Sequence, residues 1–143
     1  MSYMKRMDPA VKAKWLTALR SGDYKQVKGC LRGELGYCCL GVLTDVWAGE
    51  NSIEWNEPFV GAYSINAGGP YTESSVTPRD VMQWSELENS TGAVIIGTVR
   101  EGGNRASESN SSDYPYDLIV TLSDLNDNGL TFEQIADVIE YAL

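Results

Sequence analysis

The sequence predicts an α+β domain in which terminal helices pack on a small, mainly antiparallel sheet and a C-terminal helical hairpin closes the chain. Three patterns support this prediction. A capped amphipathic segment lies near the N-terminus, a β-branched run bounded by glycines lies in the second half, and two apolar stripes separated by a glycine turn end the sequence. With 143 residues and 43% apolar composition, the chain suits a single globular domain over residues 1–143.

The first helix is predicted in the segment "DPAVKAKWLTALRSG". Asp8 suits the N-cap, and Pro9 suits the first helical position because its missing N–H would have no partner there anyway. Gly22 suits the end of the helix. Apolar residues recur at helical spacing on one face: Val11, Trp15, Leu16 and Leu19. We therefore expect this face to enter the core.

The next segment predicts two strands followed by a second helix. Tyr24–Leu31 has the pattern of a strand, "RGELG" that of a turn, and Tyr37–Cys39 that of a returning strand. Leu40–Ala48 is predicted to be helical, with Gly49 at its end. The short apolar run "YCCLGVL" has no periodicity that separates strand from helix, so the boundary inside it is open.

Residues 50–76 are rich in Gly, Pro, Ser, Asn and aromatic side chains, and "IEW" and "FVGAYSI" are candidate short strands. The segment "TPRDVMQWSEL" predicts a short helix with Thr77 as N-cap, Pro78 at the first helical position and Asp80 in the first turn. The run "GAVIIGTV" predicts the strongest strand, because it is β-branched and bounded by glycines. A flexible loop is expected after it, at about residues 100–114.

The closing stretch "SDLNDNGLTFEQIADVIEYAL" permits two interpretations. Four residues follow the opening of a calcium loop: Asp124, Asn126, Asn128 and Gly129. Such a loop has a bidentate Glu at position twelve, where this chain has Ile135. The alternative is a turn between two helices, in which Gly129 is a left-handed cap and Thr131 with Gln134 forms a capping box. The missing carboxylate favours the helical hairpin.

Apolar stripes are predicted on both sides of this turn. The stripe before it comprises Leu118, Ile119, Leu122 and Leu125, and the stripe after it comprises Phe132, Ile135, Ala136 and Ile139. The expected core of the whole domain includes Trp15, Leu19, Cys39, Leu43, Trp84, Ile95, Leu122, Phe132, Ile135 and Ile139.

Charge is distributed unevenly along the chain. Residues 1–32 contain eight Lys/Arg and two Asp, a net charge of +6, whereas residues 33–143 carry −15, which leaves −9 in total. Either the two parts fold against each other and partly neutralise, which we favour, or one part faces a charged partner. The sequence pI of about 4.4 disfavours the binding of duplex DNA.

Several classes of chemistry are excluded or unsupported. The chain has no histidine, which rules out His-based triads and Cys–His nucleophile pairs. Cys30, Cys38 and Cys39 lack the spacing of a zinc site and are expected to be reduced core residues. No glycine motif for nucleotide phosphates is present. The sequence therefore predicts no catalytic residue, no metal ligand and no cofactor, although a carboxylate-based enzyme stays open among 20 acidic residues.

Candidate ligand-binding residues come from the basic N-terminal third and from nearby aromatics. The cations suited to a phosphate-bearing ligand are Arg20, Lys25, Lys28 and Arg32, and the aromatics available for stacking are Tyr24 and Trp55. If Tyr24–Arg32 is one strand, Lys28 and Arg32 share a face and Lys25 does not. The alternative is that these lysines protect a solvated strand edge.

Four segments, in this order, resemble a family of small uncharacterised proteins encoded by tailed bacteriophages and prophages: "KWLTALRSGDYKQVKGCLR", "GYCCLGVLTDVWAGE", "VTPRDVMQWSEL" and "LSDLNDNGLTFEQIADVIE". The shared pattern is Trp-x-x-Ala-Leu-Arg-Ser-Gly, Tyr-Cys-Cys-Leu-Gly-Val-Leu, a short helix containing Trp, and Leu-Asn-Asp-x-Gly with Phe-x-x-Ile-Ala-Asp. Residues 50–76 and 88–116 carry no part of it. The resemblance implies a phage origin and action in the host cytoplasm, and it transfers no catalytic residue.

We therefore expect an accessory protein that acts by binding, for example in counter-defence, either by sequestering an anionic nucleotide signal or by blocking a host protein. An acidic DNA mimic is an alternative, because residues 33–143 are strongly negative, as is a carboxylate-based enzyme of unknown substrate. No stretch has the roughly 20 apolar residues of a membrane helix, and the N-terminus has no signal-peptide pattern. The sequence does not decide between a monomer and a homo-oligomer.

Overall fold

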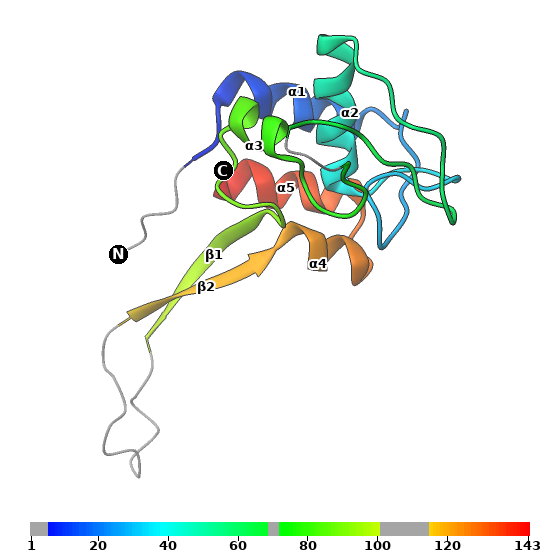
Figure 1. The fold of residues 1–143 in the computed structure, drawn as a ribbon. Helices are drawn as coiled ribbons and strands as arrows, with labels where there is room; N and C mark the ends of the chain where they lie inside the picture. Colours follow the sequence, from blue (N-terminus) through cyan, green and yellow to red (C-terminus); the bar gives the residue numbers. More distant parts are fainter. Residues whose placement is uncertain (1–5, 69–71, 101–114) are drawn as a thin grey trace.

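The computed structural model describes residues 6–68, 72–100 and 115–143. Within these ranges the chain forms helices and one two-stranded antiparallel sheet, an α+β arrangement with a C-terminal helical pair, which confirms the predicted fold class (Figure 1). The elements, in chain order, are α1 Pro9–Arg20, α2 Cys39–Asn51, α3 Arg79–Ser85, β1 Ala93–Arg100, β2 Pro115–Thr121, α4 Leu122–Asp127 and α5 Phe132–Ala142. The expected loop at 100–114 lies outside the described residues apart from its first residue.

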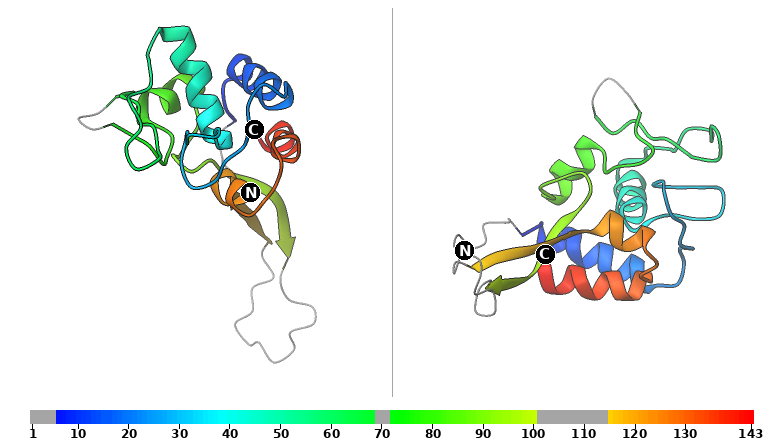
Figure 2. Two further views of the ribbon diagram at one scale, coloured as in Figure 1. Left: turned by 90° about the vertical axis from the view of Figure 1, so that its right-hand side faces the viewer. Right: turned by 90° about the horizontal axis from the view of Figure 1, so that it is seen from below.

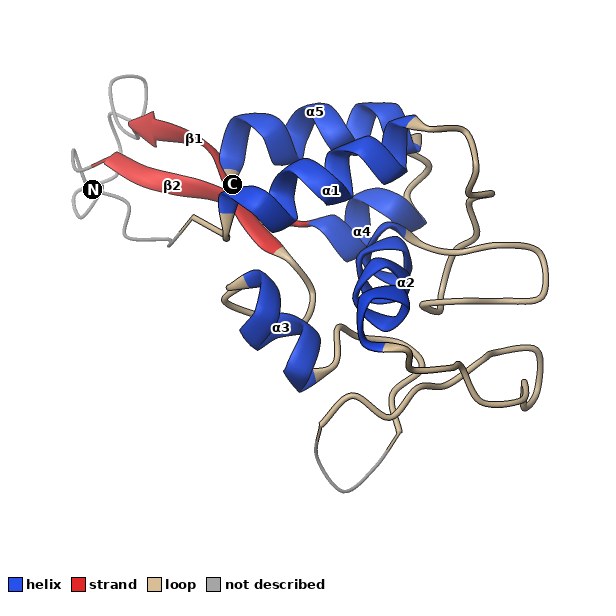
Figure 3. Ribbon diagram, turned by 90° about the horizontal axis from the view of Figure 1, so that it is seen from above, coloured by secondary structure: helices blue, strands red, loops and turns tan. Residues whose placement is uncertain are grey.

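The core lies between α1, α2, α4 and α5. Helices α1 and α5 run side by side, and α2 packs against α1 and α4 (Figure 3). Trp15 of α1 is fully buried and donates its indole N–H to the backbone oxygen of Cys39, 2.9 Å away, at the start of α2. The predicted cap of α1 is confirmed, because the carboxylate of Asp8 accepts from the backbone N–H of Ala10 and Val11. The hydrogen bond of Trp15 thus fixes the position of α1 relative to the start of α2.

Most of the expected core residues are buried, with two exceptions. Trp84 is only partly buried, although it packs against the core. Ile95 is also partly exposed, because neighbouring strand residues face opposite sides and Val94 is the one that turns inward. The prediction was therefore wrong by one residue in β1, which reverses the face that enters the core.

The C-terminal helical pair has the predicted turn. Gly129 has φ +102°, and the N–H groups of Gly129 and Leu130 donate to the carbonyls of Asn126 and Leu125. These two bonds form the Schellman arrangement that ends α4. The capping box that opens α5 is present: Thr131 Oγ1 accepts from the N–H of Gln134 at 3.1 Å, and the Gln134 side chain accepts from the N–H of Thr131 at 2.9 Å.

The predicted helical stripe before this turn is wrong in its first half. Leu118 and Ile119 belong to β2, which pairs with β1 in antiparallel register, with Ile95 opposite Ile119 and Ile96 as the extra residue of a bulge. The β-branched residues that precede Leu122 favour the strand. Helix α4 begins only at Leu122 and is capped by Thr121, whose hydroxyl accepts from the N–H of Asp124. The two strands extend away from the helices (Figures 1 and 2).

The two strands predicted at Tyr24–Leu31 and Tyr37–Cys39 do not form. Only isolated bridges occur there, and Gly29 interrupts the extended backbone with φ +83°. Cys39 is instead the first residue of α2, because the Cys38 thiol caps the helix by accepting from the N–H of Gly41. The helix then continues past the predicted end at Gly49 to Asn51.

The middle segment also differs from the prediction. The candidate strands "IEW" and "FVGAYSI" are loops that carry only isolated bridges. Helix α3 is present with Asp80 in its first turn, but Pro78 occupies the N-cap position and Thr77 lies outside the helix. The Thr77 hydroxyl is buried and has no hydrogen-bond partner among the described residues, so it does not cap α3.

Candidate functional site

Three of the predicted ligand-binding residues come together in one group of aromatic and charged side chains beside α2. We call this group the aromatic cluster; its members are Tyr24, Arg32, Tyr37, Asp45, Trp55 and Tyr63. The rings of Tyr24 and Tyr37 meet edge to face with centroids 4.9 Å apart, and those of Tyr37 and Trp55 are 6.2 Å apart. Asp45 lies on α2. Tyr24, Arg32 and Tyr37 lie on the loop before α2 (the first loop, residues 21–38), and Trp55 and Tyr63 lie on the loop after it (the second loop, residues 52–78).

Arg32 is the cation of this cluster. Its guanidinium carbon lies 4.1 Å from the centroid of the Tyr63 ring, 5.2 Å from that of Tyr37 and 5.7 Å from that of Trp55. Distances below about 6 Å allow cation–π attraction to each ring. Arg32 is half-buried, and no carboxylate of the described residues lies within ion-pair distance of it. The stacked guanidinium therefore keeps N–H donors available at its edge.

Asp45 is the acceptor that organises two of the rings. Its carboxylate accepts the phenol O–H of Tyr24 at 2.7 Å and the indole N–H of Trp55 at 2.9 Å. Burial and then the bond to Asp45 raise the pKa of Tyr24, so the phenol stays a donor at neutral pH. Burial is also the main cause that raises the pKa of Tyr37. The polar atoms of Tyr24 and Trp55 are thus already used within the protein.

Backbone hydrogen bonds hold the two loops together. The N–H of Tyr63 donates to the carbonyl of Arg32 at 2.9 Å, and Gly33 bridges to Ala62. The first loop closes on itself, because the N–H of Tyr37 donates to the carbonyl of Lys25 at 2.8 Å. The turns at residues 33–36 and 59–62 therefore lie side by side at the edge of the cluster.

The ends of these turns carry exposed apolar side chains. We call Leu35, Phe59 and Val60 the tip residues; they are 80%, 83% and 88% exposed. Phe59 and Ala62 exchange both of their backbone hydrogen bonds, so Val60 and Gly61 form a two-residue turn with φ of +53° and +81°. A β-branched residue with positive φ costs on the order of 1–3 kcal/mol. Val60 is therefore held in a strained and exposed position.

The remaining predicted site residues lie elsewhere. Arg20 forms ion pairs with Asp137 at 2.8 Å and Glu140 at 2.7 Å on α5, and its pKa is raised by the hydrogen bond to Glu140 and then by that to Asp137. Lys25 and Lys28 are exposed on the first loop. No strand forms over residues 24–32, so the condition under which Lys28 and Arg32 would share a strand face is not met.

Sequence reasoning missed Tyr37, Asp45 and Tyr63. The aromatic content of residues 50–76 was a partial signal for Tyr63. No signal marked Asp45, because a single acid on a predicted helix has no distinguishing spacing. Its role follows only from the path of the two loops around α2.

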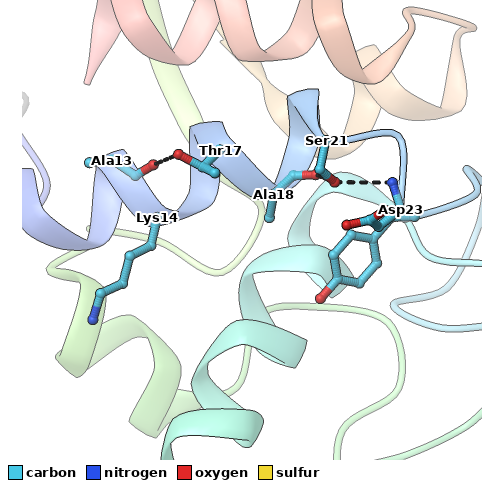
Figure 4. A pocket seen from close by; sticks show the side chains of 7 residues that line it. Ala13, Lys14, Thr17, Ala18, Ser21 and Asp23 are labelled. Carbon is cyan, nitrogen blue, oxygen red and sulfur yellow. Dashed lines mark hydrogen bonds between the residues drawn. The ribbon is translucent and has the colours of Figure 1, made fainter.

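A shallow pocket of about 420 Å³ adjoins the cluster at Tyr24. Its other lining residues come from α1 and the turn after it: Ala13, Lys14, Thr17, Ala18, Ser21 and Asp23 (Figure 4). The ammonium group of Lys14 already pairs with Glu50 at 2.7 Å. The pocket thus offers one carboxylate, that of Asp23, and no free cation of its own, so its charges do not suit a phosphate.

The stretch that resembles a calcium loop has a structural role. Asn126 is fully buried, and its side-chain oxygen accepts from the N–H of Cys39 at 3.2 Å and from Gln26 Nε2 at 2.9 Å. Its side-chain nitrogen donates to the carbonyl of Val27 at 2.8 Å. Ile135, at position twelve, is also fully buried. Asn126 therefore connects α4 to the first loop and to α2.

The three cysteines are free thiols. Burial raises the pKa of Cys38 to about 11 and raises the pKa of Cys39 well above its usual value; the pKa of the half-buried Cys30 is raised too, chiefly by burial. These thiols stay protonated at neutral pH, so they are poor nucleophiles and poor metal ligands. Within the described ranges, no group of three or more Cys, Asp or Glu residues could hold a metal ion.

The comparison with family models decides the membership of the chain. Residues 7–143 match the model described as "Domain of unknown function (DUF8296)". The chain belongs to this family. No curated protein and no solved structure matches the DUF8296 chain. Among the helices described here, none is long and apolar enough to cross a membrane.

Proposed function

We propose that this DUF8296 protein acts by binding another protein through the aromatic cluster and the adjoining tip residues. Because the sequence resembles a phage family, we propose that the partner is a protein of the bacterial host and that binding blocks it in the host cytoplasm. The observation that carries this proposal is the position of Arg32, which is stacked on three rings without a carboxylate partner among the described residues, beside three exposed apolar side chains.

The composition of this surface is that of a protein-binding hot spot. Trp, Tyr and Arg dominate the energy of protein interfaces, because they offer large rigid areas together with hydrogen-bond donors. Arg32 can donate to an acidic side chain of a partner, and the rings already hold its guanidinium in place. Preorganisation of this kind lowers the entropic cost of binding.

The tip residues favour a protein over a small molecule. Phe59 and Val60 project from a tight turn and are almost fully exposed, so they can enter a concave apolar pocket on a partner. Residues 33–78 contain no Lys or Arg, and the exposed acids Glu34, Glu54 and Glu57 lie on the same two loops. The surface therefore fits a partner whose apolar pocket has a basic rim.

A nucleotide ligand is the second candidate, and the edge donors of Arg32 favour it too. Two observations make a nucleotide a weaker candidate than a protein. Trp55 is half-buried, its indole N–H is bonded to Asp45 and Arg32 lies at its ring, so a base would compete with the cation for this ring. Arg20 is neutralised by two acids on α5 and is not available for a phosphate. The same ion pairs neutralise two acidic side chains, which makes a DNA mimic a weaker candidate as well.

The test uses the protein expressed in host cells and recovered under native conditions. Native mass spectrometry of the wild type is expected to detect a stoichiometric protein partner. Leu35→Ser combined with Phe59→Ser should remove that partner without unfolding the protein, because both side chains are exposed. Tyr141→Ser is the matched control, since Tyr141 is 67% exposed on α5.

Two results would contradict the proposal. One is a partner that the double variant retains as well as the wild type. The other is a retained small anion of nucleotide mass with no protein partner. Loss of that anion in Arg32→Gln would then place the nucleotide at the same cluster.

A further inference from the structure

The two-stranded ribbon formed by β1 and β2 extends beyond the helices (Figures 1 and 2). An isolated two-stranded ribbon has marginal stability in water, because half of its backbone groups lack a protein partner and one hairpin buries little apolar surface. Among the helices, β1 makes its principal contacts with α5, and the far end of the ribbon extends away from the helices (Figure 1). The outer part of the ribbon therefore has little support from the rest of the described chain.

The β2 edge is the less protected of the two. The principal contacts of β2 are with β1 and with α4, the helix that continues directly from it. Strand β1 carries the bulge at Ile96, a feature that commonly discourages pairing at an edge. Among the described residues β2 has no strand on its second side, and alternate residues there direct N–H and C=O groups outward.

The same strand exposes large apolar side chains. Leu118 is 42% exposed and Ile119 is 55% exposed, and these neighbours face opposite sides of the ribbon. Ile119 lies opposite Ile95, which is also partly exposed. An open strand edge with β-branched and aliphatic residues is a template for another strand.

The distribution of charge indicates that the strand that pairs with β2 comes from a second copy of the chain. The protein carries −9, so two copies repel each other at most surfaces. The fifteen residues of β1 and β2 contain one Arg and one Asp and are neutral together. The ribbon therefore has an open strand edge and exposed apolar side chains, and its neutral charge lets two copies of this acidic protein meet there without repulsion.

We propose that the protein forms a twofold dimer in which β2 pairs antiparallel with β2 of a second copy, giving a four-stranded sheet. A strand paired with its own copy around a twofold axis is antiparallel, which is the arrangement such symmetry requires. Cross-strand contacts of Ile119 and Leu118 then add side-chain stabilisation to the new backbone bonds. The ribbon points away from the side on which the loops before and after α2 lie, and these loops carry the aromatic cluster, so the dimer leaves the cluster free (Figure 1).

Sedimentation equilibrium of the full chain tests this proposal. The wild type is expected at twice the monomer mass of 15.7 kDa at micromolar concentrations. Ile119→Lys should raise the dimer dissociation constant at least tenfold, because a charge on each copy is placed at the shared edge; Leu118→Lys is a second variant with the same expectation. Ile53→Lys, at an aliphatic residue on the loop after α2 that is 37% exposed, should leave the constant unchanged.

Salt and hydrogen exchange distinguish this dimer from others. Added salt should strengthen it, since the contact is neutral and the bodies repel. A dimer held by attraction between the basic N-terminal third and acidic regions would weaken instead. Amides of Asp117–Val120 should exchange more slowly in the wild-type dimer than in Ile119→Lys. A wild type that stays monomeric, a dimer unaffected by both lysine variants, or equal exchange of these amides would each overturn the proposal.

Discussion

At the scale of single residues, Asp45 decides whether the aromatic cluster exists. It accepts hydrogen bonds from Tyr24 and Trp55, which belong to different loops. The position of the Arg32 guanidinium in turn depends on the rings that it contacts. A single acid on α2 therefore supports the cation that the proposed binding requires.

Asp45→Ala should lower the free energy of unfolding by roughly 1–3 kcal/mol, because it leaves two partly buried donors without an acceptor. Urea unfolding measures the change. Asp137→Ala is the control: it removes one of the two exposed ion pairs of Arg20, so its effect on the free energy of unfolding should be much smaller. Equal effects of the two substitutions would mean that Asp45 does not organise the cluster.

Asn126 is the second decisive residue. Its side chain makes three hydrogen bonds in a fully buried site, so Asn126→Ala should cost on the order of 2–4 kcal/mol in urea unfolding. Asp124 lies two residues earlier in the same motif and is exposed, so Asp124→Ala should lower the free energy of unfolding much less. Similar losses from both would contradict the role of Asn126 as a link between α4, α2 and the first loop.

The same geometry predicts the response to calcium. Millimolar calcium should leave the melting temperature unchanged, because the Asn126 oxygen is already bonded and position twelve is the buried Ile135. A bound ion would add about 4 kcal/mol at a thousandfold excess over its dissociation constant. A rise in melting temperature that Asp124→Ala abolishes would restore the calcium interpretation.

At the scale of elements, the start of α2 is packed against the first loop. A Cβ at Gly41 would collide with the backbone carbonyl of Leu31, whereas a Cβ at Gly49 in the same helix meets nothing within 4 Å. Gly41→Ala should therefore destabilise the protein by roughly 3 kcal/mol or more. Gly49→Ala should be neutral or stabilise it by up to about 1 kcal/mol. Thermal unfolding of both variants tests the packing, and equal stabilities would refute it.

The helical pair at the C-terminus can be tested at its turn. Thr131→Ala removes the cap of α5 and should cost about 1 kcal/mol. Gly129→Ala should cost a similar amount through left-handed strain alone, because no atom lies within 4 Å of the added Cβ. Neutral behaviour of both variants in urea unfolding would be incompatible with this turn.

Elements with local chemical signals were predictable from the sequence. Asp8 and Pro9 marked α1, Gly129 and Thr131 marked the last turn, and the β-branched run marked β1. Tyr24–Leu31 was misassigned, because its alternation is typical of a strand while its hydrogen bonds go to a distant loop and to Asn126. Local patterns carry no information about such long-range partners.

At the scale of the whole molecule, the charge asymmetry is partly neutralised within the fold. Lys14 pairs with Glu50, and Arg20 pairs with Asp137 and Glu140, so each of these ion pairs joins the basic N-terminal third to the acidic remainder. This supports the favoured interpretation of the charge pattern. Of the cations in the predicted site, Arg32 alone lies against aromatic rings in the described structure, and no sequence pattern distinguishes it from Lys28.

The central claim is that the tip residues contact a protein partner, and site-specific photo-cross-linking in host cells tests it most directly. A photo-reactive phenylalanine analogue at Phe59 should give a covalent adduct with one protein, because this side chain is 83% exposed beside Arg32 and its rings. The same analogue at Tyr141, exposed on α5, should give no such adduct. An adduct formed from position 141 and absent from position 59 would contradict the account.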